Sequence, residues 1–319
     1  MNDELSRHWE QAMTEAERLQ LEQQWRDANK QARQVEMERR TREHQLKVAR
    51  YKKHQEIRSL AGPDPLNIHA IGDSWFEYPL DGNIPIPFSN FGIVGDSQLG
   101  AKGSPHPNIL SRAEHGQAST AVLSWENQSI MVNDWIDHAN WTNGKLDAIL
   151  VSMGGDDIVG DQLAIYLTYG GGVHAAAGRF QGVLDLVSAS YSDLFAMRDL
   201  FASDVPIFGH CYDYALPNGI PAAEVFGPWL QPSFNFAYYN FSDAQQVVVD
   251  MIDKFYSMLN GLASNPKNNF HLIDTRKTIP PNNTPPDGWA NELHPYITGF
   301  SHLADKFLAA LRGHFPGRI

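Results

Sequence analysis

Short apolar runs alternate with helix-forming stretches from residue 64 to the end of the chain, and this alternation limits the possible folds more than any other feature. The runs that predict strands cover residues 68–71, 108–112, 148–153, 205–210 and 270–273. The stretches that predict helices lie near 119–139, 180–202, 243–263 and 299–312. Strands that alternate with helices form a parallel sheet with helices on both faces. The sequence therefore predicts an α/β protein with three layers, α/β/α, around a mostly parallel five-stranded sheet.

The first 61 residues have a different composition, because they contain no Gly and no Pro. They are rich in residues that favour helix, and Gly62 and Pro63 end the pattern. A single helix of about 57 residues would be roughly 85 Å long, whereas a body of about 260 residues has a radius of gyration of about 18 Å. We therefore predict a charged helical extension over 1–61, folded back as a hairpin or paired in a coiled-coil-like way, and an α/β domain over 62–319. A solvated, partly frayed extension is the alternative.

Charge and cysteine content exclude several classes of protein. The formal net charge is −12 and the pI is about 5.5, which disfavours binding to nucleic acid or to anionic membranes. The single cysteine, Cys211, excludes an internal disulfide and a multi-cysteine metal site. The N-terminus has no apolar signal region, and no run of about 18 apolar residues predicts a transmembrane segment. We expect a cytoplasmic protein by default, although export without a signal would leave no mark in the sequence.

Residues with catalytic potential follow the predicted strands, at the edge where parallel sheets place their sites. Gly72-Asp73-Ser74-Trp75 follows the first strand, and its serine becomes a nucleophile if a base removes the hydroxyl proton. Gly116 follows the second strand and offers an unhindered backbone N–H. Gly154-Gly155-Asp156-Asp157 follows the third, and Asn291-Glu292-Leu293-His294 precedes the last helix. A histidine is the usual base for a serine, and a third group normally orients its ring.

Taken in this order, the four blocks resemble those of the SGNH (GDSL-like) hydrolase family, over roughly residues 65–315. The resemblance implies a flavodoxin-like α/β/α fold and ester hydrolysis without a cofactor or a metal. It implies that Ser74 is the nucleophile and His294 the general base. It also implies an oxyanion hole made by the backbone N–H groups of Ser74 and Gly116 and by the side chain of Asp156. The expected substrate is a small-molecule or lipid ester that carries an acyl or acetyl group, carbohydrate esters included.

Asp156 departs from the family pattern, which has an asparagine at this place in the oxyanion hole. An ionised Asp only accepts hydrogen bonds, whereas an Asn amide donates them. Two negative charges about 4 Å apart repel by about 4 kcal/mol at an effective dielectric of about 20, and the loss of one oxyanion donor costs about 2.7–4 kcal/mol. Asp156 can therefore serve if it is protonated, which burial beside Asp157 favours. Alternatively, it turns away and leaves two backbone donors.

Asn291 is the second departure, because the family has there the Asp that orients the catalytic histidine. A neutral Asn can hold the ring, but it cannot stabilise an imidazolium and can favour the wrong tautomer. We rank Asn291 or a backbone carbonyl first as the orienting group, Glu292 second and Asp287 third. The two departures support a second hypothesis, a catalytically impaired SGNH-fold protein that uses the pocket and the N-terminal helix to bind or scaffold partners.

A long aromatic segment, residues 210–243, separates the fourth predicted strand from the next helix. Loops of this length in compact domains usually have a function. Its Tyr212 and Trp229, together with Asp73 and Trp75, are predicted to bind substrate. The segment forms either an aromatic wall over Ser74 or a hydrophobic cluster that covers the sheet edge. A second insertion, residues 76–107, is predicted to form a rim on the other side.

Other features have simpler interpretations. Asp156, Asp157 and Asp161 have no further ligand at a suitable spacing, so we expect no metal site. The three glycines at 170–172 lack the Gly-Lys-Ser/Thr of a phosphate loop and predict a flexible connection. Cys211 follows an apolar strand, which predicts a buried thiol rather than a reactive one. Residues 1–60 are predicted to mediate a homo-oligomer or a contact with a partner protein.

Overall fold

The computed structural model describes residues 34–54, 63–81, 84–85, 89–222 and 227–319, in two compact units, Met1–Glu43 and His44–Ile319. A helix covers residues 34–54. In the first unit, Glu36 pairs with Arg39 and Arg40, and Arg39 also pairs with Glu43, at helical spacings of three and four. The boundary predicted between residues 61 and 62 lies outside the described residues, as do residues 1–33 of the predicted extension.

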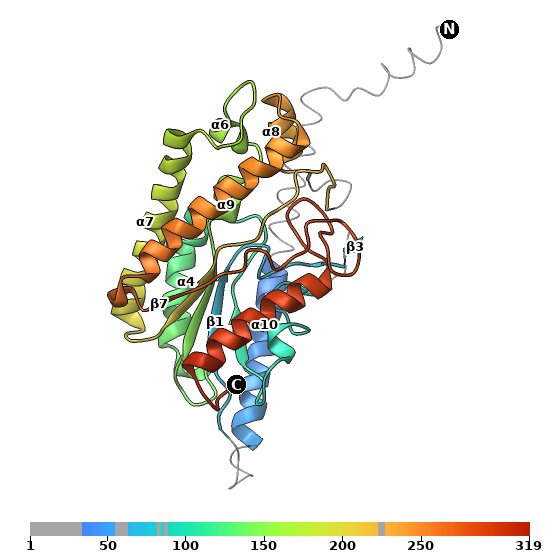
Figure 1. Ribbon diagram of the computed structural model, residues 1–319. Coiled ribbons are helices and arrows are strands. Elements are labelled where there is room, and N and C mark those ends of the chain that lie inside the picture. Colours follow the sequence, from blue (N-terminus) through green and yellow to red (C-terminus); the bar gives the residue numbers. More distant parts are fainter. Residues whose placement is uncertain (1–33, 55–62, 82–83, 86–88, 223–226) are drawn as a thin grey trace, which may run out of the picture. The chain divides into compact units, whose positions relative to one another are not determined.

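The second unit is built on a five-stranded parallel sheet (Figure 1). Its strands are β1 (Asn67–Gly72), β4 (Asn108–Ser111), β5 (Ala148–Ser152), β6 (Ile207–His210) and β7 (Phe270–Ile273). They lie in the order β4-β1-β5-β6-β7, and every neighbouring pair is parallel. Numbered along the chain, this order is 2-1-3-4-5, the doubly wound order of flavodoxin-like folds. The predicted fold class is therefore confirmed.

Helices cover both faces of the sheet (Figure 1). On one side lie α4 (Trp125–Ile136), α7 (Ala177–Phe201) and α9 (Phe241–Ala263), with α7 packed against the other two. On the other side lies α10 (Ile297–His314), which contacts β7 and the short η1 (Leu99–Ala101). Right-handed crossovers account for the common side of α4, α7 and α9, since the three connections that contain them advance along the sheet in one direction, whereas the first connection runs back. The result is the predicted three-layer architecture.

Short elements make up the connections. They are α3 (Ser119–Val122), α5 (Gly155–Ile158), α6 (Leu163–Tyr166), α8 (Gln231–Phe236), η2 (His138–Asn140), η3 (Pro266–Asn268) and the antiparallel pair β2 (Leu80–Asp81) and β3 (Ile84–Pro85). The helix predicted near 119–139 is in fact two, α3 and α4. The side chain of Ser124 accepts a hydrogen bond from the Asn127 N–H and starts α4 there. Among the helices of the described ranges, none has the length and apolar character that a membrane crossing needs.

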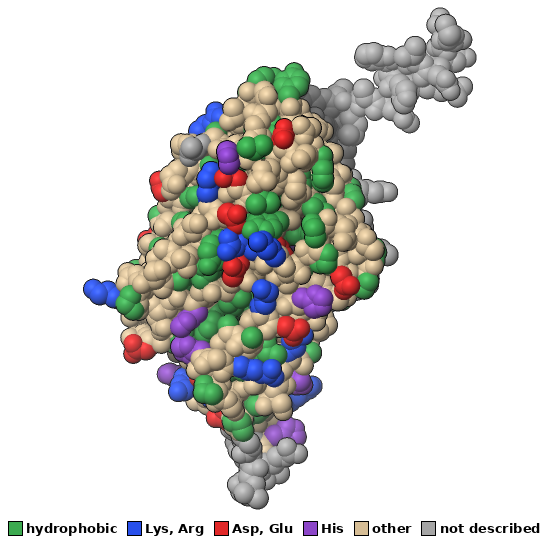
Figure 2. Space-filling model, viewed as in Figure 1, with side chains coloured by type: hydrophobic (Ala, Val, Ile, Leu, Met, Phe, Trp, Pro, Cys, Tyr) green, Lys and Arg blue, Asp and Glu red, His purple; other side chains and the backbone are tan. Residues whose placement is uncertain are grey.

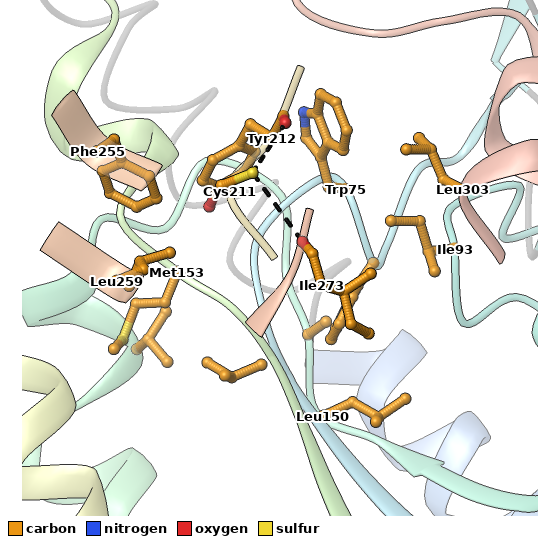
Figure 3. Close-up of a cluster of buried hydrophobic side chains, with 14 of the residues drawn as sticks. Trp75, Ile93, Leu150, Met153, Cys211, Tyr212, Phe255, Leu259, Ile273 and Leu303 are labelled. Carbon is orange, nitrogen blue, oxygen red and sulfur yellow. Dashed lines mark hydrogen bonds between the residues drawn. The ribbon is translucent and has the colours of Figure 1, made fainter. Parts of the chain in front are cut away.

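The hydrophobic core extends up to the carboxyl edge of the sheet. Figure 3 shows Trp75 and Tyr212 within this core, with Phe255 of α9 and Leu303 of α10 also contributing to it. Cys211 lies among them, buried and free as predicted, and burial raises the pKa of its thiol to about 11. On the face seen in Figure 2, basic side chains lie among acidic ones rather than in one continuous patch.

Candidate active site

Ser74 lies in a tight turn directly after β1. The strand ends at Gly72, whose φ is 139° and where a Cβ would lie 2.0 Å from the carbonyl oxygen of Ser152, so only glycine fits. The Asp73 N–H donates to that same carbonyl at 3.0 Å, and the Asp73 carbonyl accepts the Phe76 N–H at 3.1 Å. This turn holds Ser74 at the carboxyl edge of the sheet with 9% of its surface exposed.

His294 faces the serine. Its Nε2 lies 2.7 Å from Ser74 Oγ, and its Nδ1 lies 3.1 Å from Asn291 Oδ1. The same Oδ1 accepts the backbone N–H groups of Leu293 and His294, each at 3.0 Å. Because these donors fix Oδ1 as an acceptor, Nδ1 carries the ring proton and Nε2 presents a lone pair to the serine hydroxyl. Asn291 thus selects the tautomer that a general base requires.

Two aromatic residues enclose the histidine. The Tyr78 ring stacks on it with centroids 4.3 Å apart, and the Tyr78 hydroxyl accepts a hydrogen bond of 2.8 Å from Asn291 Nδ2. The Trp229 ring meets it edge-on at 5.8 Å. Burial lowers the pKa of His294 to about 3, and the charge of His115 contributes a little. Sequence reasoning missed Tyr78, because nothing distinguishes this tyrosine from the other aromatic residues until the 76–107 insertion packs on the histidine.

The other two candidates for orienting His294 are engaged elsewhere or exposed. The carboxylate of Glu292 accepts backbone N–H groups of the segment after β6, from Gly219, Trp229, Leu230 and Gln231. Glu292 is fully buried and holds that segment through these hydrogen bonds, which does not fit its second rank as the group that orients the His294 ring. Asp287 is exposed on the surface. Among the three ranked side chains, Asn291 alone contacts the ring.

Asp73 lies beneath Ser74 in a buried hydrogen-bond network and is only 1% exposed. Its Oδ1 accepts the Ser152 hydroxyl at 2.6 Å and the Trp75 N–H at 3.0 Å, and its Oδ2 accepts the Tyr212 hydroxyl. His210 Nε2 lies 2.9 Å from Ser152 Oγ, and His210 Nδ1 accepts the Tyr212 N–H, so the proton on Nε2 points at the serine. Asp73 therefore supports the turn, and because it also lines the pocket beside Ser74, its predicted contact with substrate stays a prediction.

The aromatic segment separates into buried and exposed side chains. Tyr212 is 4% exposed and Trp75 is 5% exposed, with Trp75 stacked on His210 at 5.4 Å, so both belong mainly to the core. Phe236 and Tyr238, by contrast, are 67% and 71% exposed. Trp75 and Tyr212 therefore belong to the hydrophobic core and also line the pocket that contains Ser74, so both predicted roles of the segment stay open. Trp229 contacts the ring of His294 but is not among the described residues that line the pocket, so its predicted contact with substrate stays a prediction.

Asp156 is the second residue of α5, which begins at Gly155 after the left-handed Gly154. Within the described part of the chain its Oδ2 is buried and has no hydrogen-bond partner. Burial raises the pKa of Asp156 well above its ordinary value, and the charges of Asp73 and Asp157 raise it further. Asp157, by contrast, accepts the Ser119 N–H at 2.7 Å and the Ser119 hydroxyl at 2.8 Å. These surroundings favour the protonated form of Asp156, whose O–H is a donor.

A pocket with an empty volume of about 410 Å³, part of it open to solvent, joins these groups. Ser74, His294 and Asp156 line it on the polar side. Its apolar lining includes Ile158, Val159, Ala215, Ile252 and Leu293. Gly116 has a φ of 74° and is exposed, and it is not among the described residues that line the pocket. In the described ranges, no group of three or more His, Cys, Asp or Glu side chains is arranged to hold a metal ion.

No sequence-family model and no curated protein matches this chain. Solved structures with a similar chain path include an extracellular lipase from Streptomyces rimosus, with 14% identity, a TM-score of 0.48 and coverage of 77% of this chain and 99% of that one. A carbohydrate acetylesterase from Sinorhizobium meliloti has 10% identity, a TM-score of 0.47 and coverage of 78% and 100%. A phospholipase A1 from Streptomyces albidoflavus has 10% identity, a TM-score of 0.46 and coverage of 78% and 99%. In its sheet order, and in the order of the Ser74, Asp156 and His294 blocks along the sheet edge, the chain resembles the SGNH (GDSL-like) hydrolases.

Proposed function

We propose that this protein is a serine ester hydrolase of the SGNH type. The observation that carries the proposal is the 2.7 Å contact between Ser74 Oγ and His294 Nε2 at the mouth of a pocket. Asn291 keeps the ring in the tautomer that can accept the serine proton. A serine and a histidine at this separation form the pair that nucleophilic catalysis requires.

The reaction has two halves. Ser74 Oγ attacks the acyl carbon of the ester while His294 Nε2 takes the hydroxyl proton, and the imidazolium then gives that proton to the leaving alcohol. In the second half, His294 takes a proton from water, and the resulting hydroxide attacks the acyl-serine. The acid is released, and the proton on Nε2 returns to Ser74 Oγ. Only the ester and water are consumed, so the cycle needs no cofactor.

Three donors are proposed to meet the oxyanion: the backbone N–H groups of Ser74 and Gly116 and the protonated carboxyl of Asp156. A neutral carboxylic acid donates one hydrogen bond through its O–H, and it can therefore take the place of an amide donor. The unpartnered, buried Oδ2 of Asp156 supports this role. Donors of this kind contribute most where water is excluded.

The pocket supports an ester with a short acyl group, an acetyl group included. Ile158, Val159 and Ala215 line the pocket together with Ser74 and would provide apolar contacts for the acyl group. The alcohol part of the substrate, whether a lipid, a sugar or another small molecule, would extend toward solvent.

Residues 1–60 remain a proposed contact for a second copy or a partner protein, and their deletion should reduce the particle mass measured by light scattering.

A second candidate function is a binding or scaffold role with little catalysis. Asn291 favours it, because a neutral amide gives no counter-charge to an imidazolium. The two candidates differ in whether Ser74 is activated, since a merely structural serine does not react with an electrophilic phosphonate.

The test is intact-mass analysis after treatment with a fluorophosphonate, followed by peptide mapping. We expect one adduct, on Ser74, and none in Ser74→Ala. Ser192→Ala is the matched control, because it removes an exposed serine on α7 and should leave labelling unchanged. Hydrolysis of short-chain p-nitrophenyl esters at the same rate by the wild type and Ser74→Ala would favour the binding protein.

A further inference from the structure

We infer that the hydrogen-bond network beneath Ser74 decides which of two neighbouring carboxyl groups, Asp73 or Asp156, holds a proton, and thereby keeps Asp156 as a hydrogen-bond donor. The inference rests on the proposed function for its catalytic consequence. Both side chains line the same pocket. Two such groups cannot both ionise cheaply, so the one with more hydrogen-bond donors takes the charge.

Asp73 has three donors, and the network fixes the direction of two of them. Ser152 Oγ accepts the His210 Nε2–H at 2.9 Å, so the serine's own proton is free to point at Asp73. Tyr212 Oη accepts the Gly155 N–H at 2.9 Å, so its proton also points at Asp73. The Trp75 N–H is the third donor. Burial raises the pKa of Asp73 to about 6, and the hydrogen bonds from these three donors oppose that rise by favouring the charged form.

Among the described residues, no donor reaches Asp156 Oδ2, and the groups around Asp156 favour its neutral form. The nearby charges are those of Asp73 and Asp157, and both are negative. His294 lines the same pocket, and burial keeps it neutral. Tyr191 donates its hydroxyl to the Met153 carbonyl at 3.2 Å and contributes no charge.

Tyr212 also fixes where Asp156 stands. Its hydroxyl donates to the Asp73 carboxylate and accepts the N–H of Gly155. Gly155 is the residue that immediately precedes Asp156. A Cβ on Gly155 would lie 2.7 Å from the Tyr212 ring, so the ring packs directly on this turn. Tyr212 and Ser152 are therefore positioning residues, which act on the reaction through Asp73 and Asp156.

The test is a double-mutant cycle between Tyr212→Phe and Asp156→Asn. Tyr212→Phe removes a donor from Asp73, so the shared proton moves toward Asp73 and Asp156 gains charge. We expect kcat/KM to fall by about 10–100-fold and the alkaline limb of the pH profile to move to lower pH, since a lost oxyanion donor costs about 100–1000-fold. In the Asp156→Asn background the donor is permanent, and Tyr212→Phe should cost less than about 3-fold. Equal losses in both backgrounds would mean that Tyr212 acts through packing alone, and would overturn the inference.

Tyr191→Phe is the matched control, because it removes a buried hydroxyl that bonds to Met153 and not to Asp73. Tyr191→Phe should change kcat/KM by the same factor in the wild type and in the Asp156→Asn background. A second readout does not need activity: the infrared carbonyl band of a protonated carboxyl should be present in the wild type and absent in Asp156→Asn. A missing band would overturn the inference even if Ser74 is labelled. An unlabelled Ser74 together with a present band would refute the proposed function and leave the proton assignment standing.

Discussion

The turn after β1 and the turn after β5 each place an aspartate at the same edge of the sheet, in opposite surroundings. Asp73 lies beneath Ser74 with donors on both carboxylate oxygens. Asp156 is the second residue of α5, and one of its buried oxygens has no hydrogen-bond partner among the described residues. The residue type is the same, but the local supply of donors decides which one carries a charge. An acid can therefore occupy a position that calls for a neutral donor, provided that its neighbour takes the charge.

The largest effect on the free energy of unfolding should come from a substitution that forces the turn after β1 away from the end of β5. Gly72→Ala puts a Cβ 2.0 Å from the Ser152 carbonyl oxygen, at a φ of 139°. We expect a loss of about 3–5 kcal/mol in the free energy of unfolding, measured with urea, because overpacking and backbone strain combine. Gly182→Ala in α7 is the control, since it has open space and should stabilise by about 0.5–1 kcal/mol. Similar stabilities for the two variants would contradict the close approach.

Glu292 tests whether a saturated carboxylate is structural, as we argue for Asp73. Glu292→Gln would turn an NH₂ group toward backbone N–H donors that now reach a carboxylate oxygen. We expect a loss of about 2–3 kcal/mol in the free energy of unfolding, because buried donors lose their acceptor. Hydrogen exchange should accelerate first at the amides of Leu230 and Gln231. A change in the pH profile without a change in stability would instead suggest a role at His294.

Asn291→Asp tests the other side of the site by adding a carboxylate beside the histidine. We expect the pKa of His294 to rise from about 3 and kcat at neutral pH to increase about 10-fold, since the imidazolium gains a counter-charge. The new oxygen would face the Tyr78 hydroxyl, which can donate to it. Asn291→Ala is the paired control and should lower kcat, because nothing then selects the tautomer. If Asn291→Asp also lowers kcat, the site does not work as a serine–histidine pair.

The fold was largely predictable, because each buried strand is a short apolar run. The run 270–273 is the whole of β7, and 148–153 overruns β5 by one residue. The one-turn helices α5, α6 and α8 were not predicted, since four to six residues show too little periodicity.

The site was predictable only where its residues form local motifs. The Ser74 and His294 blocks have recognisable patterns, whereas the network under Ser74 joins residues 79 and 139 positions apart in the chain. Tyr212 stands in an aromatic segment, which suggested a substrate contact, and only the folded chain brings it to Asp73. The same holds for Tyr78, which lies 213 positions before Asn291. Long-range hydrogen bonds leave no periodic mark in a sequence.

The smallest change in rate should come from Asp156→Asn, which replaces one donor with another. At acid and neutral pH we expect kcat/KM to stay within about 3-fold of the wild type, because both a protonated Asp and an Asn donate. The pH profile of kcat/KM should differ more. His294 is a base only above its pKa of about 3, so both proteins should work at about pH 4–5, where an ordinary histidine is protonated.

As pH rises, the wild type should lose activity when Asp156 ionises, and Asp156→Asn should not. Asp156→Leu is the control that removes the donor altogether, and it should be slow at every pH, since one oxyanion donor accounts for about 100-fold or more. An alkaline fall of the same size in Asp156→Asn would mean that another group titrates. The proton on Asp156 would then have no part in catalysis, and the contrast between the two turns would be one of structure only.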